Sequence, residues 1–483
     1  MLFNSYYFIL LFLPITWCIY FGLNALKKYK LAQVSLVAAS LFFYGYYNWY
    51  YLSIICVSII VNYGIAKVIG RENYKHRKSI LTLGLAFNIG LLLYFKYTNF
   101  FIDNINAIFH TDFFVRQILL PLGISFYTFQ QIGFLVDVYR EETENLQLEF
   151  LDYAEFVSFF PQLVAGPIVS KELIYQIKDL SNRKVNFDNM AGGLMLFAIG
   201  LFKKVILADT FARAVNWGFS NISGMNSVDA VIVMLSYTFQ IYFDFSGYSD
   251  MALGLAGMFN FKLPLNFNAP YQSYDILEFW QRWHMTLTSF LQKYIYIPLG
   301  GNRKGKVRTY VNVLAVFLIS GFWHGANWTF VVWGMLHGVA SVLNRTFKKQ
   351  WDKLHRAFRW ICTFVFINLT WLVFRADTLS QAKEMIAKIF AGEMGRVSKV
   401  LAAKYSLMET EILNYILLQN YALSQTYMIY VFIIVSTMIV VCVRPFCMKK
   451  FSPNIRNFLG IMFIIVWSVL SLAGESDFIY FGF

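Results

Sequence analysis

Residues 311–345 read VNVLAVFLISGFWHGANWTFVVWGMLHGVASVLNR, and no Asp, Glu, Lys or Arg occurs in this stretch before Arg345. A helix needs about 20 predominantly apolar residues to cross the ~30 Å hydrocarbon core of a bilayer. The stretch is long enough for two passes, so it predicts a chain built from membrane-spanning helices.

Apolar runs of this kind recur along the chain and alternate with short clusters of charge. The other runs lie near 6–26, 31–47, 50–69, 80–96, 118–137, 190–207, 229–246, 360–374, 427–443 and 457–473. With 58% hydrophobic and 14% charged residues among 483, the apolar surplus exceeds what a soluble core can bury. We therefore predict an all-α polytopic membrane protein with about a dozen transmembrane helices.

The formal charge of +14 is concentrated in clusters between the apolar runs. These clusters are Lys27–Lys30, Arg71–Lys78, Lys171–Lys184, Arg303–Arg308, Lys348–Arg359 and Arg444–Arg456. Because Lys and Arg beside membrane spans hold loops on the cytoplasmic side, the charge requires no nucleic-acid partner. Assigning every cluster to the cytoplasm places both termini outside. It also places residues 375–426 outside, as an amphipathic surface layer.

Prolines mark the middle of the chain as irregular. Six of the nine fall between residues 121 and 298, namely Pro121, Pro161, Pro167, Pro264, Pro270 and Pro298. Broken backbone at membrane depth needs protein or a water-filled cavity to satisfy its polar groups, so we expect broken, re-entrant and interfacial helices around a cavity. We interpret residues 1–483 as one membrane domain, with N-terminal helices in 1–117, a core around the expected cavity in 118–345 and C-terminal helices in 346–483.

Three of the six histidines, His284, His324 and His337, lie in apolar surroundings. Ionisable groups at membrane depth usually face a bundle interior or an aqueous pathway, and imidazole is a suitable proton acceptor. The alternative to a catalytic role is a packed histidine that donates a hydrogen bond to a carbonyl. We favour this alternative for His337, because its distance of thirteen residues from His324 places it on nearly the opposite face of a continuous helix.

His284 lies in a stretch with helical periodicity. It shares one predicted face with the apolar residues Ile276, Trp280, Leu287 and Leu291. This pattern is typical of a helix that lies along an interface or a cavity wall.

Two polar stretches allow more than one interpretation. Asp244, Ser246, Tyr248 and Asp250 interrupt an apolar region, and they indicate either a hydrated cavity or a helix N-terminus, since Ser and Asp are also good N-caps. The loop 298–306, PLGGNRKGK, could contact the phosphates of a nucleotide-bearing acyl donor, but it is more simply a cytoplasmic topology anchor.

Motifs of several other enzyme classes are absent from the sequence. It has no GxSxG, Walker, HExxH or GxGxxG motif, and its five cysteines form no CxxC pair, so we expect neither a zinc site nor a redox role. The absence of an internal repeat argues against the inverted-repeat architecture that many secondary transporters have. Two interpretations remain: an enzyme with histidine-based chemistry in a membrane cavity, and a channel lined by the same groups.

Five motifs together resemble the bacterial membrane-bound O-acyltransferases of the alginate O-acetyltransferase type, which include relatives that acetylate peptidoglycan. The motifs are PLGISFYTFQ at 121–130, FPQLVAGPI at 160–168, DFSGYSD at 244–250, FWQRWH at 279–284 and WHGANW at 323–328. The resemblance spans nearly the whole chain. It implies a ring of helices around a central tunnel, with His324 and His284 as catalytic residues. Further residues implied to line the tunnel or bind substrate are Trp323, Asn327, Asp244, Ser246, Tyr248, Asp250, Trp283 and Arg282.

The resemblance also implies an activity. An acetyl thioester, acetyl-CoA or another, would dock from the cytoplasm, and His324 would act as general base on an incoming hydroxyl. We expect no bound cofactor or metal, an extracytoplasmic polysaccharide acceptor, an SGNH-type acetyltransferase partner, and a location in the bacterial cytoplasmic membrane. D-alanyl transfer to teichoic acid from a carrier-protein thioester and a non-catalytic polysaccharide channel are the alternatives.

The aromatic C-terminal tail, ESDFIYFGF at 475–483, follows the last apolar run. Such a tail could simply rest in the membrane interface, where Phe and Tyr are favoured. The sharper hypothesis is that the tail folds back to the tunnel mouth and that Tyr480 carries the acyl group as a phenyl ester. A phenol is easier to deprotonate than a sugar hydroxyl, and its ester is a more reactive acyl donor.

Overall fold

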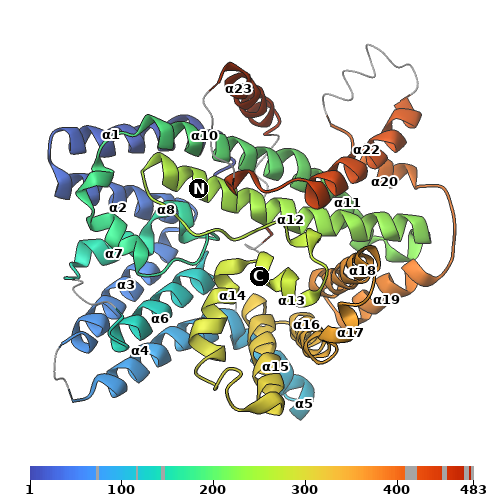
Figure 1. Cartoon of the computed structure of the whole chain (residues 1–483), viewed down its shortest axis with the longest axis horizontal. Helices are drawn as coiled ribbons and strands as arrows, with labels where there is room; N and C mark the ends of the chain where they lie inside the picture. The colour runs from blue at the N-terminus through green and yellow to red at the C-terminus, as the bar shows by residue number, and fades with distance from the viewer. Residues whose placement is uncertain are drawn as a thin grey trace. The chain divides into compact units, whose positions relative to one another are not determined.

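The computed structural model describes residues 1–71, 75–115, 118–142, 147–407, 421–448, 454–472 and 478–479, and these ranges contain helices but no strand (Figure 1). The chain is an all-α polytopic membrane protein, as predicted. It folds into two compact units, one formed by 1–198, 248–265 and 451–461 and the other by 199–247, 266–450 and 462–483.

The first unit contains most of the N-terminal helices. These are η1 (Phe8–Phe12), α1 (Leu13–Ala25), α2 (Tyr29–Gly45), α3 (Trp49–Ile69), α4 (Arg77–Leu92), η2 (Leu93–Tyr97), α5 (Thr98–Phe109), α6 (Ile124–Tyr139), α7 (Phe150–Ser158), α8 (Phe160–Leu163), α9 (Glu172–Lys178) and η3 (Leu180–Arg183). Helices α10 (Phe187–Phe202), α12 (Ser227–Met258) and α23 (Ile455–Leu470) contribute residues to both units.

The second unit contains the remaining helices. These are η4 (Lys203–Ala208), α11 (Asp209–Ser220), η5 (Ile222–Gly224), η6 (Pro270–Gln272), α13 (Ile276–Arg282), α14 (Met285–Leu291), η7 (Gln292–Tyr296), α15 (Gly305–His324), α16 (Trp328–Thr346), α17 (Lys348–Trp351), α18 (Arg356–Arg375), α19 (Leu379–Phe390), α20 (Lys399–Ala403), α22 (Tyr421–Cys442) and η8 (Phe446–Met448).

Each apolar run of the sequence coincides with one or more of these helices. Helical stretches that are long and apolar enough to cross a membrane are Phe8–Ala25, Trp49–Ile69, Arg77–Phe109, Phe187–Ser220, Ser227–Met258, Arg356–Arg375 and Thr426–Met448. These 7 stretches, found among the described residues, establish a multi-pass protein. The figure of about a dozen crossings stays a prediction.

The run 311–345 forms two helices, α15 and α16, and its interpretation as two membrane passes stays a prediction, because neither helix is among the 7 stretches. The two helices pack closely because glycines face each other's backbone. A Cβ atom on Gly321 would lie 2.4 Å from the carbonyl oxygen of Phe330, and one on Gly334 would lie 2.4 Å from that of Phe317. Small residues at such crossings are what allow membrane helices to approach closely. This pair therefore fixes the end of α15, where His324 lies.

The middle of the chain is irregular where its prolines lie, but it also contains the long apolar stretches Phe187–Ser220 and Ser227–Met258, so the expectation of broken helices throughout it is wrong. All six of its prolines lie in loops or in helical turns of at most 4 residues, such as α8. Between Pro167 and Pro264, α12 runs uninterrupted for 32 residues.

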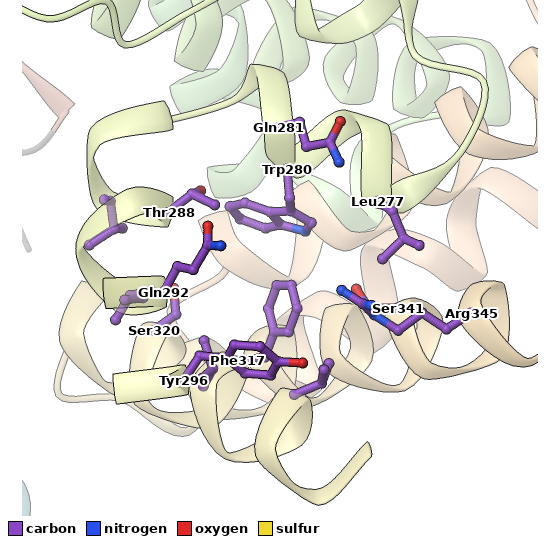
Figure 2. A pocket seen from close by; sticks show the side chains of 14 residues that line it. Leu277, Trp280, Gln281, Thr288, Gln292, Tyr296, Phe317, Ser320, Ser341 and Arg345 are labelled. Carbon is purple, nitrogen blue, oxygen red and sulfur yellow. The ribbon is translucent and has the colours of Figure 1, made fainter. Parts of the chain in front are cut away.

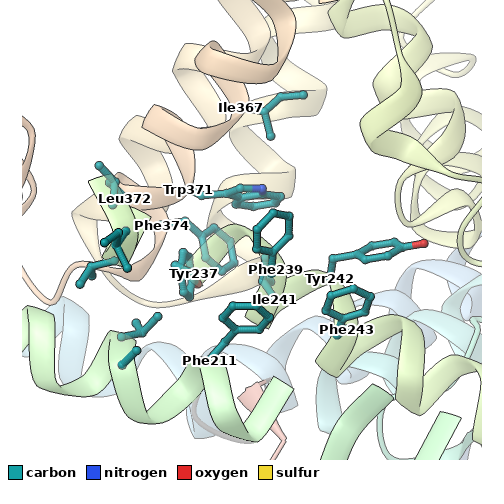
Figure 3. Close-up of a cluster of buried hydrophobic side chains, with 14 of the residues drawn as sticks. Phe211, Tyr237, Phe239, Ile241, Tyr242, Phe243, Ile367, Trp371, Leu372 and Phe374 are labelled. Atoms are coloured by element: carbon teal, nitrogen blue, oxygen red, sulfur yellow. The ribbon is translucent and has the colours of Figure 1, made fainter. Parts of the chain in front are cut away.

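The core of the second unit is an aromatic cluster (Figure 3). Phe211, Phe239 and Tyr237 approach it from α11 and α12, and Trp371 and Phe374 approach it from α18. Each of these side chains is at most 1% exposed. Helix α19, inside the segment predicted to be amphipathic, buries Ala382 and Met385 against the same core, and its polar residues face outward. Because both α15 and α18 border this cluster, it fixes the surroundings of His324.

Candidate active site

His324 is the last residue of α15, and the short linker 325–327 connects it to α16. Asn327 ends this linker as the N-cap of α16. Its side-chain oxygen accepts a hydrogen bond from the backbone N–H of Thr329 at 3.1 Å, and its amide donates to the carbonyl of Asp377 at 2.8 Å. The predicted substrate-binding residue Asn327 therefore holds the linker that positions His324.

Three aromatic rings enclose the imidazole of His324, which is 3% exposed. The centroids of Trp323, Trp333 and Phe374 lie 5.0, 5.1 and 5.2 Å away, all close to edge-to-face. Such edge-to-face contacts favour one ring orientation. The enclosure thus holds a potential proton acceptor in a fixed direction inside a largely apolar site.

His284 lies between two short helices, α13 and α14, and not within one continuous helix. The prediction of an uninterrupted helical face through His284 is wrong. Its backbone adopts the left-handed conformation at φ 44° and ψ 53°, which ends the first helix and starts the second in a new direction. A non-glycine residue in this conformation is uncommon and marks a position that the surrounding structure holds in place.

The imidazole of His284 is completely buried and contacts a fixed amide. Its Nδ1 lies 3.3 Å from Oδ1 of Asn266, which also accepts the hydroxyl of Thr286 at 2.7 Å. Because Oδ1 can only accept, Nδ1 carries the hydrogen in this contact, and Nε2 is the acceptor of the neutral ring. Asn266 was not among the predicted residues.

Trp323 connects the two histidines. Its ring centroid lies 5.0 Å from that of His324 and 6.0 Å from that of His284. Phe245 of α12 closes the other side of His284, with centroids 4.8 Å apart. The structure therefore gathers both predicted catalytic histidines around Trp323, although forty residues separate them in the sequence.

His337 has a different kind of environment. It is fully buried in α16, its Nδ1 accepts the indole N–H of Trp280 at 3.2 Å, and its Nε2 lies 3.0 Å from the hydroxyl of Thr370. Both ring nitrogens are thus occupied by side chains that belong to the packed core. This arrangement matches the packed histidine predicted for His337, although α15 and α16 are separate helices and the argument from a continuous helix does not apply.

Trp283 and Arg282, two predicted tunnel residues, have local partners. Trp283 is 1% exposed and stacks on Phe279 at 5.6 Å, within the aromatic core. Arg282 pairs with Glu278 at 2.8 Å and donates to the carbonyl of Asn268 at 3.3 Å. These contacts stabilise the break between α13 and α14 that places His284.

The polar run 244–250 lies in the interior of α12, so its interpretation as a helix N-cap is wrong. Asp244 pairs with Lys204 at 2.8 Å, and Ser246 accepts a hydrogen bond from Lys203 at 3.5 Å. Both lysines are buried, and neither was predicted. Two adjacent lysines inside an apolar run were a usable signal, because charged groups in such runs are costly and usually functional.

Tyr248 and Asp250, which complete that run, belong to the other compact unit from the two histidines. Tyr248 is 2% exposed and stacks on Phe3 with ring centroids 5.0 Å apart, and Asp250 is 4% exposed. Tyr480 lies outside the described residues. Within the described ranges, no group of three or more His, Cys, Asp or Glu residues could hold a metal ion.

A cavity of about 260 Å³ lies beside this site (Figure 2). Its wall includes Ser320, one helical turn before His324, and Trp280, whose ring packs edge-to-face on Trp333 at 5.7 Å. The wall also carries Ser341, whose buried hydroxyl has no hydrogen-bond partner among the described residues, and Arg345, which is exposed. The cavity is lined mostly by apolar groups with a few polar side chains, and it suits an amphipathic ligand.

Known proteins match this chain at several levels. The model of the membrane-bound O-acyltransferase family matches residues 140–377. The chain is 40% identical to a peptidoglycan O-acetyltransferase of Helicobacter pylori, over 100% of this chain and 98% of that protein. It is 38% identical to a probable alginate O-acetylase AlgI of Azotobacter vinelandii, over 88% of this chain and 86% of that protein. A teichoic acid D-alanyltransferase of Streptococcus thermophilus is 30% identical over 47% of this chain and 58% of that protein.

Proposed function

Because the chain belongs to the membrane-bound O-acyltransferase family, we propose that it moves an acetyl group from a cytoplasmic thioester to an extracytoplasmic polysaccharide. The enzyme class, an O-acyltransferase, follows from the family. The acceptor class is inferred from relatives that are named for peptidoglycan and alginate. The observation that carries the proposed mechanism is the enclosure of His324 at the end of α15, with His284 beside the same tryptophan.

His324 is the proposed general base. It takes the proton of the acceptor hydroxyl as the oxygen attacks the thioester carbonyl, and it returns that proton to the departing thiolate. The carbon–sulfur bond breaks as the carbon–oxygen bond forms, so an acetyl ester and a free thiol are the products. His284 orients the reactants or stabilises the developing oxyanion, because Asn266 fixes its ring.

We propose that the cavity of Figure 2 is the donor site, which the sequence topology would place toward the cytoplasm. Polar residues spaced along apolar walls suit the amide-bearing arm of an acyl thioester such as acetyl-CoA, and Ser341 offers an unused hydroxyl. Arg345 adds positive charge at one part of the wall. The basic loop 298–306 begins two residues after Tyr296, another wall residue, and we propose that this loop contacts the donor's phosphates.

The acceptor side is proposed from the sequence topology. With the basic clusters in the cytoplasm, both termini lie outside the bacterial cytoplasmic membrane, where an SGNH-type transferase would receive the acetyl group. D-alanyl transfer to teichoic acid is the weaker alternative, because the D-alanyltransferase match covers only 47% of the chain.

The proposed function is tested by complementation. In a strain that lacks this gene, the returned gene restores O-acetyl groups on the envelope glycan, and His324→Ala abolishes them while the protein level stays within about twofold. His76→Ala, which alters an exposed histidine, serves as the matched control and keeps acetylation. Wild-type acetylation in the His324→Ala strain would contradict the proposal, and so would thioester turnover that does not depend on His324.

The carrier role of Tyr480 is a further part of this proposal. Tyr480→Phe keeps the apolar ring and removes only the oxygen, so it abolishes acetylation if the phenol carries the acetyl group. Tyr47→Phe, at a tyrosine that is 55% exposed, is the control and keeps acetylation. Full acetylation by Tyr480→Phe, with no acetylated C-terminal peptide in a strain lacking the downstream transferase, would exclude the carrier role.

A further inference from the structure

We propose that the ion cluster formed by the buried Lys204 and Asp244 with the partly exposed Asp209 is a binding site for an aromatic peptide segment, and that its occupant is the chain's own C-terminal tail at Phe478 and Ile479. The cluster and both tail residues belong to the same compact unit. The binding is a property of the folded chain and needs no acyl donor.

The cluster is built on an irregular helical turn. Lys204 lies in η4, a π-helical turn that is buried along its whole length between α10 and α11. Its ammonium lies 2.8 Å from Oδ1 of Asp209 and 2.8 Å from Oδ1 of Asp244. The side chains of Lys204 and Asp244 are only 2% and 3% exposed. Such turns are frequent at functional sites, and charges this deep require several partners.

The tail supplies two of those partners. The backbone N–H of Ile479 donates to Oδ2 of Asp244 at 3.0 Å, and the ring of Phe478 lies 4.7 Å from Nζ of Lys204. Phe478 is 2% exposed, and Ile479 packs against the hydrophobic core of the unit. One tail residue therefore contacts the cation and the next contacts the anion.

Asp244 is complementary to this occupant in a specific way. Its Oδ1 accepts from Lys204 and its Oδ2 accepts from Ile479, so the carboxylate bridges the core and the tail. If the tail left, Oδ2 would lose a hydrogen bond in a buried position, which is costly, and the face of Lys204 now covered by Phe478 would open. A main-chain donor and an aromatic ring are thus the recognised features.

The consequence for function rests on the proposed function. The hydrogen bond at Ile479 fixes the backbone immediately before Tyr480. Lys204 and Asp244 are then positioning residues, since they act on the proposed carrier through the tail. Their loss would lower acetylation without touching the histidines.

Labelling of a cysteine in the tail tests the binding directly. The full chain, with its five native cysteines replaced by serine, receives Ile479→Cys, which keeps the backbone N–H. The purified protein in lipid nanodiscs is labelled with a maleimide under conditions without any acyl donor. Docking of the tail predicts slow labelling.

Asp244→Asn is the sharpest variant, because asparagine keeps the shape but turns one acceptor into a donor. Whichever way the amide is turned, its NH₂ group faces either the ammonium of Lys204 or the N–H of Ile479. We expect labelling to rise about tenfold, the change that corresponds to about 1.4 kcal/mol. Phe478→Ala, which alters only the tail, gives the same rise and covers the case in which Asp244→Asn fails to fold.

Asp275→Asn is the matched control. Asp275 is also buried and paired with a lysine of this unit, Lys348 at 2.7 Å, and asparagine can still cap α13. Its labelling rate stays at the level of the parent chain. Equal labelling of the parent, Asp244→Asn and Phe478→Ala would overturn the binding site. Loss of acetylation in His324→Ala is measured separately, so failure of the proposed function leaves the labelling result unaffected.

Discussion

His324 and His337 lie on neighbouring helices, and both are buried among aromatic rings, yet their surroundings differ in kind. Trp280 and Thr370 occupy the two ring nitrogens of His337. His324 ends its helix inside an enclosure of three rings, next to the tryptophan that contacts His284. Burial alone therefore does not identify a reactive histidine. The side-chain partners of His337 and the position of His324 at a helix end distinguish their surroundings, and we propose a catalytic role only for His324.

The largest expected effect on stability concerns His337. His337→Ala removes the acceptor of a buried indole N–H and one of the two contacts of the Thr370 hydroxyl, and it leaves a cavity, so it lowers the free energy of unfolding by about 2–4 kcal/mol. Thermal unfolding in nanodiscs measures the loss. Turnover per folded molecule stays close to wild type. A large loss of turnover at unchanged stability would erase the distinction between the two histidines.

The next effect concerns the partner of His324. His284→Ala lowers kcat about 100-fold, or about 2.7 kcal/mol in the barrier, because the proposed orienting or oxyanion-stabilising group is lost. Asn266→Ala lowers kcat less, since it frees the ring without removing it. Initial rates of acetyl transfer check both. If Asn266→Ala lowered kcat as much as His284→Ala and also unfolded the protein, the role of His284 would be structural, like that of His337.

A smaller effect is expected from the packing of α15 against α16, the helices that carry His324 and His337. Gly321→Ala forces a methyl group against the carbonyl oxygen of Phe330, which should cost about 1–3 kcal/mol and displace the end of α15. Unfolding and turnover should therefore both suffer. Gly22→Ala is the control, because nothing lies within 4 Å of its added Cβ. Unchanged stability for Gly321→Ala would contradict the close packing of α15 and α16.

The smallest effect concerns the cavity. Arg345→Ala should raise KM for the thioester about fivefold, or about 1 kcal/mol, and leave kcat unchanged, as expected for a charge that contributes only to binding. Arg356→Ala, at another exposed arginine, keeps KM. A KM that Arg345→Ala does not change would contradict the proposal that the cavity binds the thioester donor.

Hydropathy predicted the helices well, because runs as long and apolar as 50–69 and 427–443 have few alternatives to a membrane helix. The break at His284 was not predictable in the same way. The apolar periodicity continues through it, from Trp280 to Leu287, and only the left-handed backbone at His284 interrupts the helix. Apolar periodicity indicates which face of a helix is buried. It contains little information on a single residue at which the chain changes direction.

The sequence indicated the histidines better than their surroundings. Rare ionisable residues in apolar runs are visible one by one, and this rule selected His324, His284 and Asp244. The partners Asn266 and Lys204 lie 18 residues from His284 and 40 residues from Asp244, and only the fold brings them within hydrogen-bonding distance.

The most direct test of the account compares two purified variants, His324→Ala and His337→Ala, in the same nanodiscs with a radiolabelled acetyl thioester. We predict that His324→Ala lowers turnover per folded molecule by about 10²–10⁴-fold with little change in thermal stability, the range for loss of a general base. His337→Ala should do the opposite, with lower stability and nearly normal turnover. Normal turnover by folded His324→Ala would contradict the central claim that His324 is the base of the acyl transfer.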